Sequence, residues 1–250
     1  MIDLSNYERI LIVADVHADA TFLKKVIKTA RDHICDAIFQ LGDFGYWPTH
    51  NANFPKASPY MPIYFIDGNH EEHPKLNQNE EYTEIVPNVY HISRGTYLKI
   101  GNMDCVAIGG AFSIDRPHRI EGHSWYHEEE ISNYDVDKCL IHKEFVPMDI
   151  IFSHDCPFSV NVVSNNHLLA IPTRERLDII KDKLDPRYWF FGHYHVDFKK
   201  YQEGTEFHGL PSNLEGYIRT VVFDCKMGKI ESEPTIDHLI SSSFFSNERK

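Results

Sequence analysis

The sequence has few cysteines and no paired cysteine motif. Its five cysteines are odd in number, stand far apart and form no C-x-x-C pair. Such usage is typical of reduced thiols in a cytosol-like compartment and argues against a small secreted disulfide framework. The chain also lacks a basic N-terminal region followed by a long apolar segment, and no apolar run approaches the ~20 residues that span a membrane. We therefore expect a cytoplasmic protein that does not enter a membrane.

Basic residues are scarce relative to acidic ones. Lys and Arg number 25 against 37 Asp and Glu, which gives 25 − 37 = −12 with histidine neutral. This balance disfavours a long nucleic-acid ligand held by counterion release, and it disfavours anionic membranes. It leaves room for a small phosphorylated substrate if metal ions supply positive charge locally. The 16 histidines are a reason to look for such metals.

The length of the chain, 250 residues, suits one large α/β domain with a full core. No internal repeat or linker divides it. We predict a single domain over residues 1–240 and a flexible tail over 241–250. The oligomeric state stays open at this stage.

Short, continuous apolar runs indicate buried strands covered on both faces. Runs of this kind lie at residues 10–14, 37–41, 63–66, 149–153 and 188–191. Helical spacing or composition predicts helices at residues 20–31, 71–78, 128–143 and 173–184. The alternation predicts βαβ units and a sheet that starts parallel. Short hairpin strands over 88–110 and antiparallel strands over 197–231, one of them at 217–224, should extend it.

Each of the five apolar runs ends in residues that can bind a metal ion. These residues are Asp15 and His17, Asp43, Asn69 and His70, His154, and His193 and His195. In α/β sheets, ligands bind beyond the carboxyl ends of the strands, so we expect the five clusters to converge on one rim. Their oxygen and nitrogen donors suit Mn²⁺, Fe, Zn²⁺ or Mg²⁺ rather than a soft metal.

Each cluster also has a structural interpretation by itself. Asp15 would serve as a helix N-cap, His154 as a core histidine, and Gly192 to His195 as a hairpin turn. Five coincidences at the same end of five strands are much harder to explain in this way.

Taken in order, the clusters resemble the calcineurin-like metallophosphoesterases. That family carries D-x-H, G-D, G-N-H-[DE], H and G-H-x-H in sequence, and all five blocks occur here between residues 15 and 195. Each block is weak alone, whereas the ordered set is highly specific. The resemblance implies an α/β fold in which helices flank a two-sheet β-sandwich. It also implies a two-metal hydrolase.

The resemblance further implies a role for each matching residue. Asp15, His17 and His195 would hold one metal, Asn69, His154 and His193 the other, and Asp43 would bridge both. A hydroxide shared by the two metals would attack phosphorus, and His70 would assist the leaving group. We expect Mn²⁺, with Fe, Zn²⁺, Mg²⁺ and Ni²⁺ as alternatives.

One block departs from part of the family. Phosphoprotein phosphatases carry G-D-x-x-D-R-G, whereas this chain has Phe44-Gly45-Tyr46-Trp47-Pro48 after Gly42-Asp43. The Asp that orients the catalytic histidine and the Arg that grips phosphate are both missing.

Substitutes for the missing Arg are predicted in the polar segment that follows residue 110. Arg116 and Arg119 are bidentate phosphate donors by type, and His123 could contact a leaving group or base. The region from Gly109 to Ile131 also resembles one in uncharacterised bacterial and phage members of the family. The alternative is that both arginines are surface charges beside the acidic run 128–130.

These observations favour a phosphoester hydrolase acting on a small phosphodiester or nucleotide. A phosphomonoesterase, protein phosphatases included, is the alternative enzyme. A non-catalytic interaction scaffold on the same fold ranks last, because scaffolds of this kind typically lose ligands or the catalytic histidine.

Overall fold

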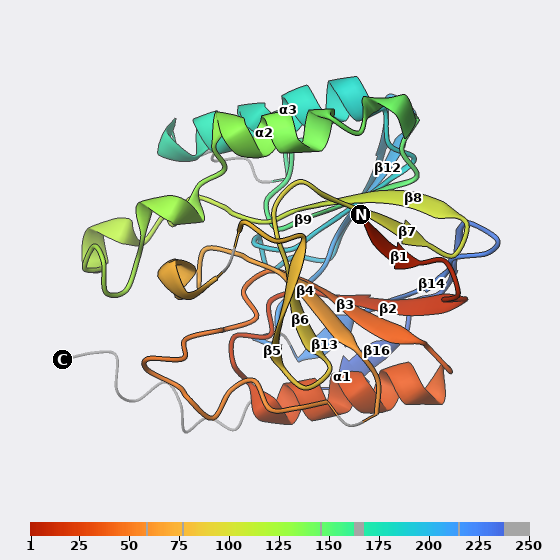
Figure 1. Ribbon diagram of the computed structural model, residues 1–250, viewed down its shortest axis with the longest axis horizontal. Coiled ribbons are helices and arrows are strands. Elements are labelled where there is room, and N and C mark those ends of the chain that lie inside the picture. The colour runs from red at the N-terminus through yellow and green to blue at the C-terminus, as the bar shows by residue number, and fades with distance from the viewer. Residues whose placement is uncertain (59, 77, 146, 163–167, 215, 238–250) are drawn as a thin grey trace.

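The computed structural model describes residues 1–237 except 59, 77, 146, 163–167 and 215 (Figure 1). The predicted tail over 241–250 lies outside the described residues, as do the last three residues of the domain predicted over 1–240.

Two seven-stranded sheets dominate the fold (Figure 1). In sheet I the order is β15 (Lys229–Ser232), β14 (Val221–Asp224), β2 (Arg9–Val13), β3 (Ala37–Leu41), β4 (Ile63–Ile66), β6 (Val89–Ile92) and β5 (Tyr82–Val86). In sheet II it is β1 (Ile2–Leu4), β7 (Thr96–Ile100), β8 (Met103–Ile108), β9 (Ile150–Ser153), β10 (Tyr188–Phe191), β12 (Thr205–Gly209) and β11 (Phe198–Gln202). Strands β2, β3, β4 and β6 run parallel to one another, as do β8, β9, β10 and β12, whereas the strands on either side of each set are antiparallel to it. A separate pair joins β13 (Tyr217–Arg219) to β16 (Thr235–Asp237).

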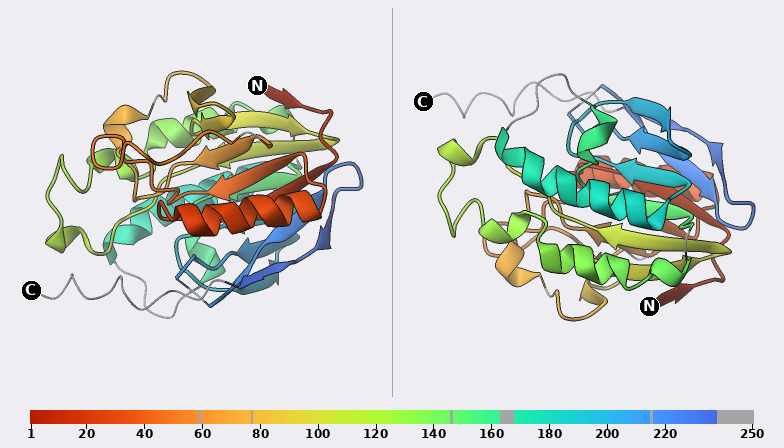
Figure 2. Two further views of the ribbon diagram at one scale, coloured as in Figure 1. Left: turned by 90° about the horizontal axis from the view of Figure 1, so that it is seen from below. Right: turned by 90° about the horizontal axis from the view of Figure 1, so that it is seen from above.

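Helices cover the outer faces of both sheets, so the molecule is layered (Figures 1 and 2). Helix α1 (Ala20–Asp32) packs on sheet I, while α2 (Asn133–Leu140) and α3 (Ile171–Leu184) pack on sheet II. Single 3₁₀ turns lie at His73–Lys75, Arg116–His118, His127–Glu129, Lys143–Phe145, Phe158–Val160 and Leu168–Ala170. The predicted two-sheet sandwich flanked by helices is confirmed.

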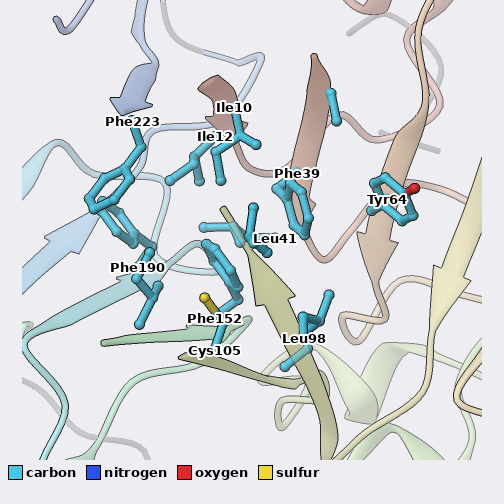
Figure 3. Packing of buried hydrophobic residues seen from close by; sticks show 14 of the residues in the cluster. Ile10, Ile12, Phe39, Leu41, Tyr64, Leu98, Cys105, Phe152, Phe190 and Phe223 are labelled. Carbon is cyan, nitrogen blue, oxygen red and sulfur yellow. The ribbon is translucent and has the colours of Figure 1, made fainter. Parts of the chain in front are cut away.

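The main core lies between the two sheets. Alternate residues of each central strand face it, as with Ile10 and Ile12 of β2, while Leu11 and Val13 face α1. Figure 3 shows Phe39 from sheet I with Phe152 and Phe190 from sheet II in this interlayer. Because both faces of these strands are buried, their sequences are continuously apolar.

Two predicted helices are shorter than expected. The helix predicted over 128–143 is limited to α2, because Ser132 caps its N-terminus in a capping box with Asp135. The residues before it form a 3₁₀ turn, His127–Glu129. In place of a helix over 71–78, the structure has one 3₁₀ turn at His73–Lys75.

The strand predicted over 217–224 is divided between two sheets. It consists of β13 and β14, which are separated at Thr220, whose N–H donates to the Pro234 carbonyl. The prediction also missed β1 and β5, which lie at the edges of sheets II and I. Edge strands are covered on fewer sides and therefore carry a weaker apolar signal.

Two observations complete the description of the fold. The five cysteines are all free and buried. Within the described residues, no helix combines the length and the apolar character that crossing a membrane requires.

Candidate dinuclear metal centre

The predicted ligands gather at one end of the sandwich, where parallel strands of both sheets finish. Asp15 and His17 follow β2, Asp43 follows β3, and His195 follows β10. Potential ligand atoms of these four side chains all lie within 4.8 Å of one another. Asp15 Oδ1 is 3.4 Å from His195 Nε2 and 3.9 Å from His17 Nε2. Residues from two sheets therefore form one compact group.

Asp43 extends this group towards the remaining ligands. Its Oδ2 is 4.0 Å from His17 Nε2, while its Oδ1 is 3.3 Å from His154 Nε2. His154 Nε2 is also 3.2 Å from Asn69 Oδ1, and the ring of His193 lies 5.1 Å from that of His154. Asp43 thus lies between the two sets of residues that the family resemblance assigns to separate metals.

The backbone at this end of the sandwich is strained. Five of the predicted ligands have a left-handed backbone, namely Asp15 (φ 52°), His17 (φ 48°), Asp43 (φ 53°), His193 (φ 66°) and His195 (φ 53°). Residues other than glycine rarely adopt such angles, and strain of this kind concentrates at functional sites. The conformation turns each side chain out of its strand and into the shared rim.

Close packing explains two of the motif glycines. A Cβ on Gly68 would lie 2.2 Å from Asp43 Oδ1, and a Cβ on Gly42 would lie 2.4 Å from His154 Nδ1. Gly42 also has φ +83°, which only glycine adopts without strain. Glycine is required at both positions so that ligand side chains from neighbouring strands can approach.

The electrostatics of the group fit a pair of bound cations. Asp15 and Asp43 are 0% and 1% exposed. In the part of the chain that the structure describes, neither carboxylate has a Lys or Arg partner. Burial disfavours the charged form of Asp43, but His154, His70 and His17 outweigh it and hold the pKa of this carboxyl well below its usual value. Buried carboxylates grouped with histidines and an amide are a donor set for divalent metals such as Mn²⁺ or Zn²⁺.

Hydrogen bonds orient two of the predicted ligands. His154 Nδ1 lies 2.7 Å from the Leu41 carbonyl, and donation there leaves Nε2 to face Asp43. The Asn69 amide donates to Ser113 Oγ over 3.0 Å, which turns its oxygen towards His154. Ser113 is buried and was not predicted as part of the site, because nothing in its local sequence distinguishes it.

Glu71 is a second residue whose role the sequence did not reveal. This buried carboxyl accepts hydrogen bonds from the N–H groups of Gly45, over 3.0 Å, and Gly68, over 2.6 Å. It thereby joins the loop after β3 to the loop after β4. Its position directly after His70 in the predicted motif is the signal that could have identified it.

His70 lies beside the gathered ligands and is partly open to solvent, with 36% of its side chain exposed. Its backbone N–H donates to Asp43 Oδ1 over 2.8 Å, and its ring centre is 5.6 Å from that of His17. Arg119 Nη2 lies 2.6 Å from Nδ1 and 2.7 Å from Nε2 of His70. Arg119 is therefore the partner of His70 in this chain, which lacks the Asp found in phosphoprotein phosphatases.

Arg119 is held over His70 by its own contacts. Its Nε donates to Asp115 Oδ2 over 2.9 Å, and its Nη1 lies 3.3 Å from both Ser113 Oγ and the Ser124 carbonyl. The predicted substrate residue Arg119 therefore reaches the rim.

The other two predicted substrate residues lie further out. Arg116 pairs with Glu129 over 2.7 Å and with Glu130 over 2.8 Å, and its guanidinium carbon lies 4.2 Å from the centre of the Trp125 ring. Arg116 is thus paired with the acidic run 128–130, as the alternative interpretation held. Where the structure describes the chain, the contacts of Arg116 do not include His70 or a predicted ligand. His123 is exposed, with its ring 4.8 Å from that of His50.

Comparison with known proteins places the chain in a family. The calcineurin-like phosphoesterase family matches residues 8–197. Among curated proteins, the lariat debranching enzyme of Schizosaccharomyces pombe is 29% identical over 189 residues, which cover 64% of this chain and 37% of that protein. The lariat debranching enzyme of Arabidopsis thaliana is 28% identical over 207 residues, or 70% of this chain and 46% of that protein. The chain thus spans less than half the length of these two relatives.

The fold has solved counterparts. A dimetal phosphatase from Danio rerio superposes with a TM-score of 0.55 and 13% identity, over 93% of this chain and 99% of that one. At this identity the likeness concerns the fold alone. The match to the family over residues 8–197 says more than this likeness of fold, since it spans all five blocks of predicted ligand residues. The chain belongs to the calcineurin-like phosphoesterase family, whose members are hydrolases that act on phosphoester bonds.

Proposed function

We propose that this chain hydrolyses a small phosphodiester or a nucleotide, using two divalent metal ions bound at the rim where β2, β3, β4, β9 and β10 end. One observation carries the proposal. The side chains of Asp15, His17, Asp43 and His195 gather within 4.8 Å of one another, with His70 beside them. Such a group of oxygen and nitrogen donors next to a partly exposed histidine suits two-metal phosphoryl chemistry.

Each ligand has a place in this proposal. Asp15, His17 and His195 would hold one ion, and Asn69, His154 and His193 would hold the other, with Asp43 between them. When bound, two divalent cations supply a water nucleophile at neutral pH and positive charge for the phosphoryl oxygens. Mn²⁺ is the ion that we expect.

His70 and Arg119 act on the leaving-group side. His70 is near enough to the rim to hold or deliver a proton at the oxygen that leaves, and its partly exposed ring admits a substrate there. Arg119 keeps the ring in place and adds positive charge next to the phosphoryl group. Asp115 and Ser113 hold Arg119, and Ser113 also turns Asn69.

Three observations favour a diester over a monoester. Trp47 stands where phosphoprotein phosphatases carry their phosphate-gripping Arg. Arg116 is engaged with two glutamates, so Arg119 is the one guanidinium among the described residues that contacts His70, whereas a monoester dianion binds best with additional cationic groups. The relatives are named for debranching lariats, and opening a nucleic-acid branch means breaking a phosphodiester. The net charge of −12 supports a small substrate over a long nucleic acid.

The first experiment compares two aryl esters after reconstitution with Mn²⁺. We expect about two ions per chain by elemental analysis and a higher kcat/KM for bis-(p-nitrophenyl) phosphate than for p-nitrophenyl phosphate. His70→Ala should keep the metals and lower kcat roughly 10²- to 10⁴-fold, whereas Asp43→Asn should lose metal, since it weakens both positions together.

The other outcomes distinguish the alternatives. A clear preference for the monoester at matched metal loading would favour a phosphomonoesterase, protein phosphatases included. Two bound ions with no hydrolysis of either ester would favour a scaffold. Clearly fewer than two ions would contradict the dinuclear centre, and loss of metal in His70→Ala would contradict the separate role given to His70.

A further inference from the structure

A row of aromatic and imidazole rings begins at Trp47, whose indole is hydrogen-bonded to the backbone carbonyl of His70. The ring of Trp47 lies 6.1 Å from that of Tyr126 and 5.7 Å from that of His50. His50 in turn lies 4.8 Å from His123. The planes of Trp47 and His50 meet at 74° and those of His50 and His123 at 72°, so the rings meet edge to face. The row joins two loops that are about 70 residues apart in sequence.

One end of the row is fixed and the other is open. The Trp47 indole donates to the His70 carbonyl over 2.6 Å, and Tyr126 is buried. His50 and His123 are both exposed, although their backbones are held. The N–H of His50 donates to the Trp47 carbonyl over 3.0 Å, and the N–H of His123 donates to the Ile120 carbonyl over 3.1 Å. Exposed rings on an ordered backbone form a surface for a ligand at little cost in conformational entropy.

The row lies on the side of His70 towards which a leaving group would extend. His70 can deliver a proton to the leaving oxygen only from hydrogen-bond distance. The rest of the leaving alcohol must then extend away from the gathered metal ligands, past His70. Trp47 is hydrogen-bonded to His70 on that side, and Arg119 faces the ring from the segment that carries His123.

We propose that Trp47, His50 and His123 form a stacking subsite for the nucleobase of the leaving nucleoside. The inference rests on the function proposed above and deepens it, because it makes the leaving group a nucleoside rather than a simple alcohol. A flat heteroaromatic ring suits these residues, since bases stack on aromatic and imidazole faces with little dependence on sequence. The imidazole N–H groups of His50 and His123 can also hydrogen-bond to base edges, whereas an aliphatic alcohol would use neither property.

The test compares two diesters that differ only in the leaving group. One is the dinucleotide in which adenosine 3′-phosphate is esterified to the 5′-oxygen of a second adenosine, and the other is adenosine 3′-methylphosphate. In the Mn²⁺-loaded double variant His50→Ala/His123→Ala, we expect kcat/KM for the dinucleotide to fall at least about tenfold further than kcat/KM for the methyl ester. His50→Phe keeps a ring and should retain most of the preference for the dinucleotide. The matched control is His118→Ala, an exposed histidine of the same segment.

Equal losses on the two substrates would overturn the subsite, because they would mean that the rings only support His70. Unchanged kinetics in the double variant would overturn it as well. If the wild-type protein hydrolyses neither diester, the proposed catalytic function is contradicted. The subsite is then tested separately, by measuring whether a nucleotide binds to it. Adenosine 5′-monophosphate added to metal-free protein should then shift the imidazole C–H resonances of His50 and His123 but not that of His118. Absence of those shifts would overturn the subsite.

Discussion

Arg116 and Arg119 are three residues apart in sequence, yet they have different surroundings. Arg119 touches His70, and Arg116 pairs with the buried carboxylate of Glu129. Glu129 also accepts from the N–H of Ser113 over 3.2 Å. From the sequence, both arginines were predicted as phosphate ligands. The sequence could not distinguish their roles, because each role depends on which side chains the arginine contacts in the folded protein.

We predict different effects for the two alanine variants. Arg119→Ala should lower kcat/KM by roughly tenfold or more, the scale of one charge-assisted hydrogen bond, with little change in the free energy of unfolding. Arg116→Ala leaves Glu129 buried without its partner and should reduce the free energy of unfolding by about 1–3 kcal/mol. Steady-state kinetics and urea denaturation on both variants measure the two effects. An Arg116→Ala protein of normal stability whose activity falls as far as that of Arg119→Ala would contradict this division.

At the scale of elements, a buried ion pair ties the end of β4 to the segment that carries Arg119. Asp67 directly follows β4, and its Oδ2 accepts from Arg94 Nε over 2.9 Å and from Arg94 Nη2 over 2.5 Å. The same guanidinium donates to the carbonyls of Glu128, Glu129 and Glu130. Arg94 thus fixes residues 128–130 against the strand whose end presents Asn69 and His70.

His73, in the 3₁₀ turn after β4, should make the stability of the protein depend on pH. Its Nδ1 is 3.8 Å from Asp67 Oδ2, and 2% of the side chain is exposed. Burial lowers the pKa of His73 to about 4 from 6.5; Asp67 opposes this, while Arg94 and His91 add to it. Between these two values the unfolded chain binds a proton that the folded protein does not, so stability should fall as the pH falls from 6.5 to about 4.

The expected contribution of His73 over that range is up to about 3 kcal/mol. Urea denaturation of metal-free wild-type protein and of His73→Asn at pH 7 and pH 5 measures it. The variant has no imidazole at this position and should lose less stability between the two pH values than the wild type. Equal pH dependence in the two proteins would show that His73 does not titrate in this way.

For the whole molecule, the gathered ligands predict a link between metal binding and stability. The predicted ligands follow five strands in two sheets, so the unfolded chain cannot offer the same site. A ligand that binds only the folded state stabilises it by about 2.7 kcal/mol at a free concentration of 100 times its Kd. For a chain of this size, we expect Mn²⁺ to raise Tm by about 5–10 °C.

Differential scanning calorimetry with Mn²⁺ and with a chelator measures this shift. Asp43→Asn is the matched control, and its Tm should respond much less to the metal. A Tm of the wild-type protein that is the same with Mn²⁺ and with chelator would contradict a metal site assembled by the fold.

The sequence by itself determined the buried strands and the order of the ligand residues. Ile10 to Ala14 and Tyr188 to Phe191 could be recognised because strands buried on both faces are continuously apolar, which is a local property. The motif residues could be placed at strand ends for the same reason. The family and the two-sheet fold followed from that order, and both are confirmed. The metal assignments of Asp15, His17, Asp43, Asn69, His154, His193 and His195 remain predictions.

Only the tertiary structure decided which distant residues meet. It divided residues 217–224 between two sheets, and it brought Arg119 rather than Arg116 to His70. It also showed that Ser113 orients Asn69 and that Trp47 supports His70. These contacts join segments more than 20 residues apart, and they depend on how the loops pack against the sheet ends. No local propensity or periodicity in the sequence carries that information.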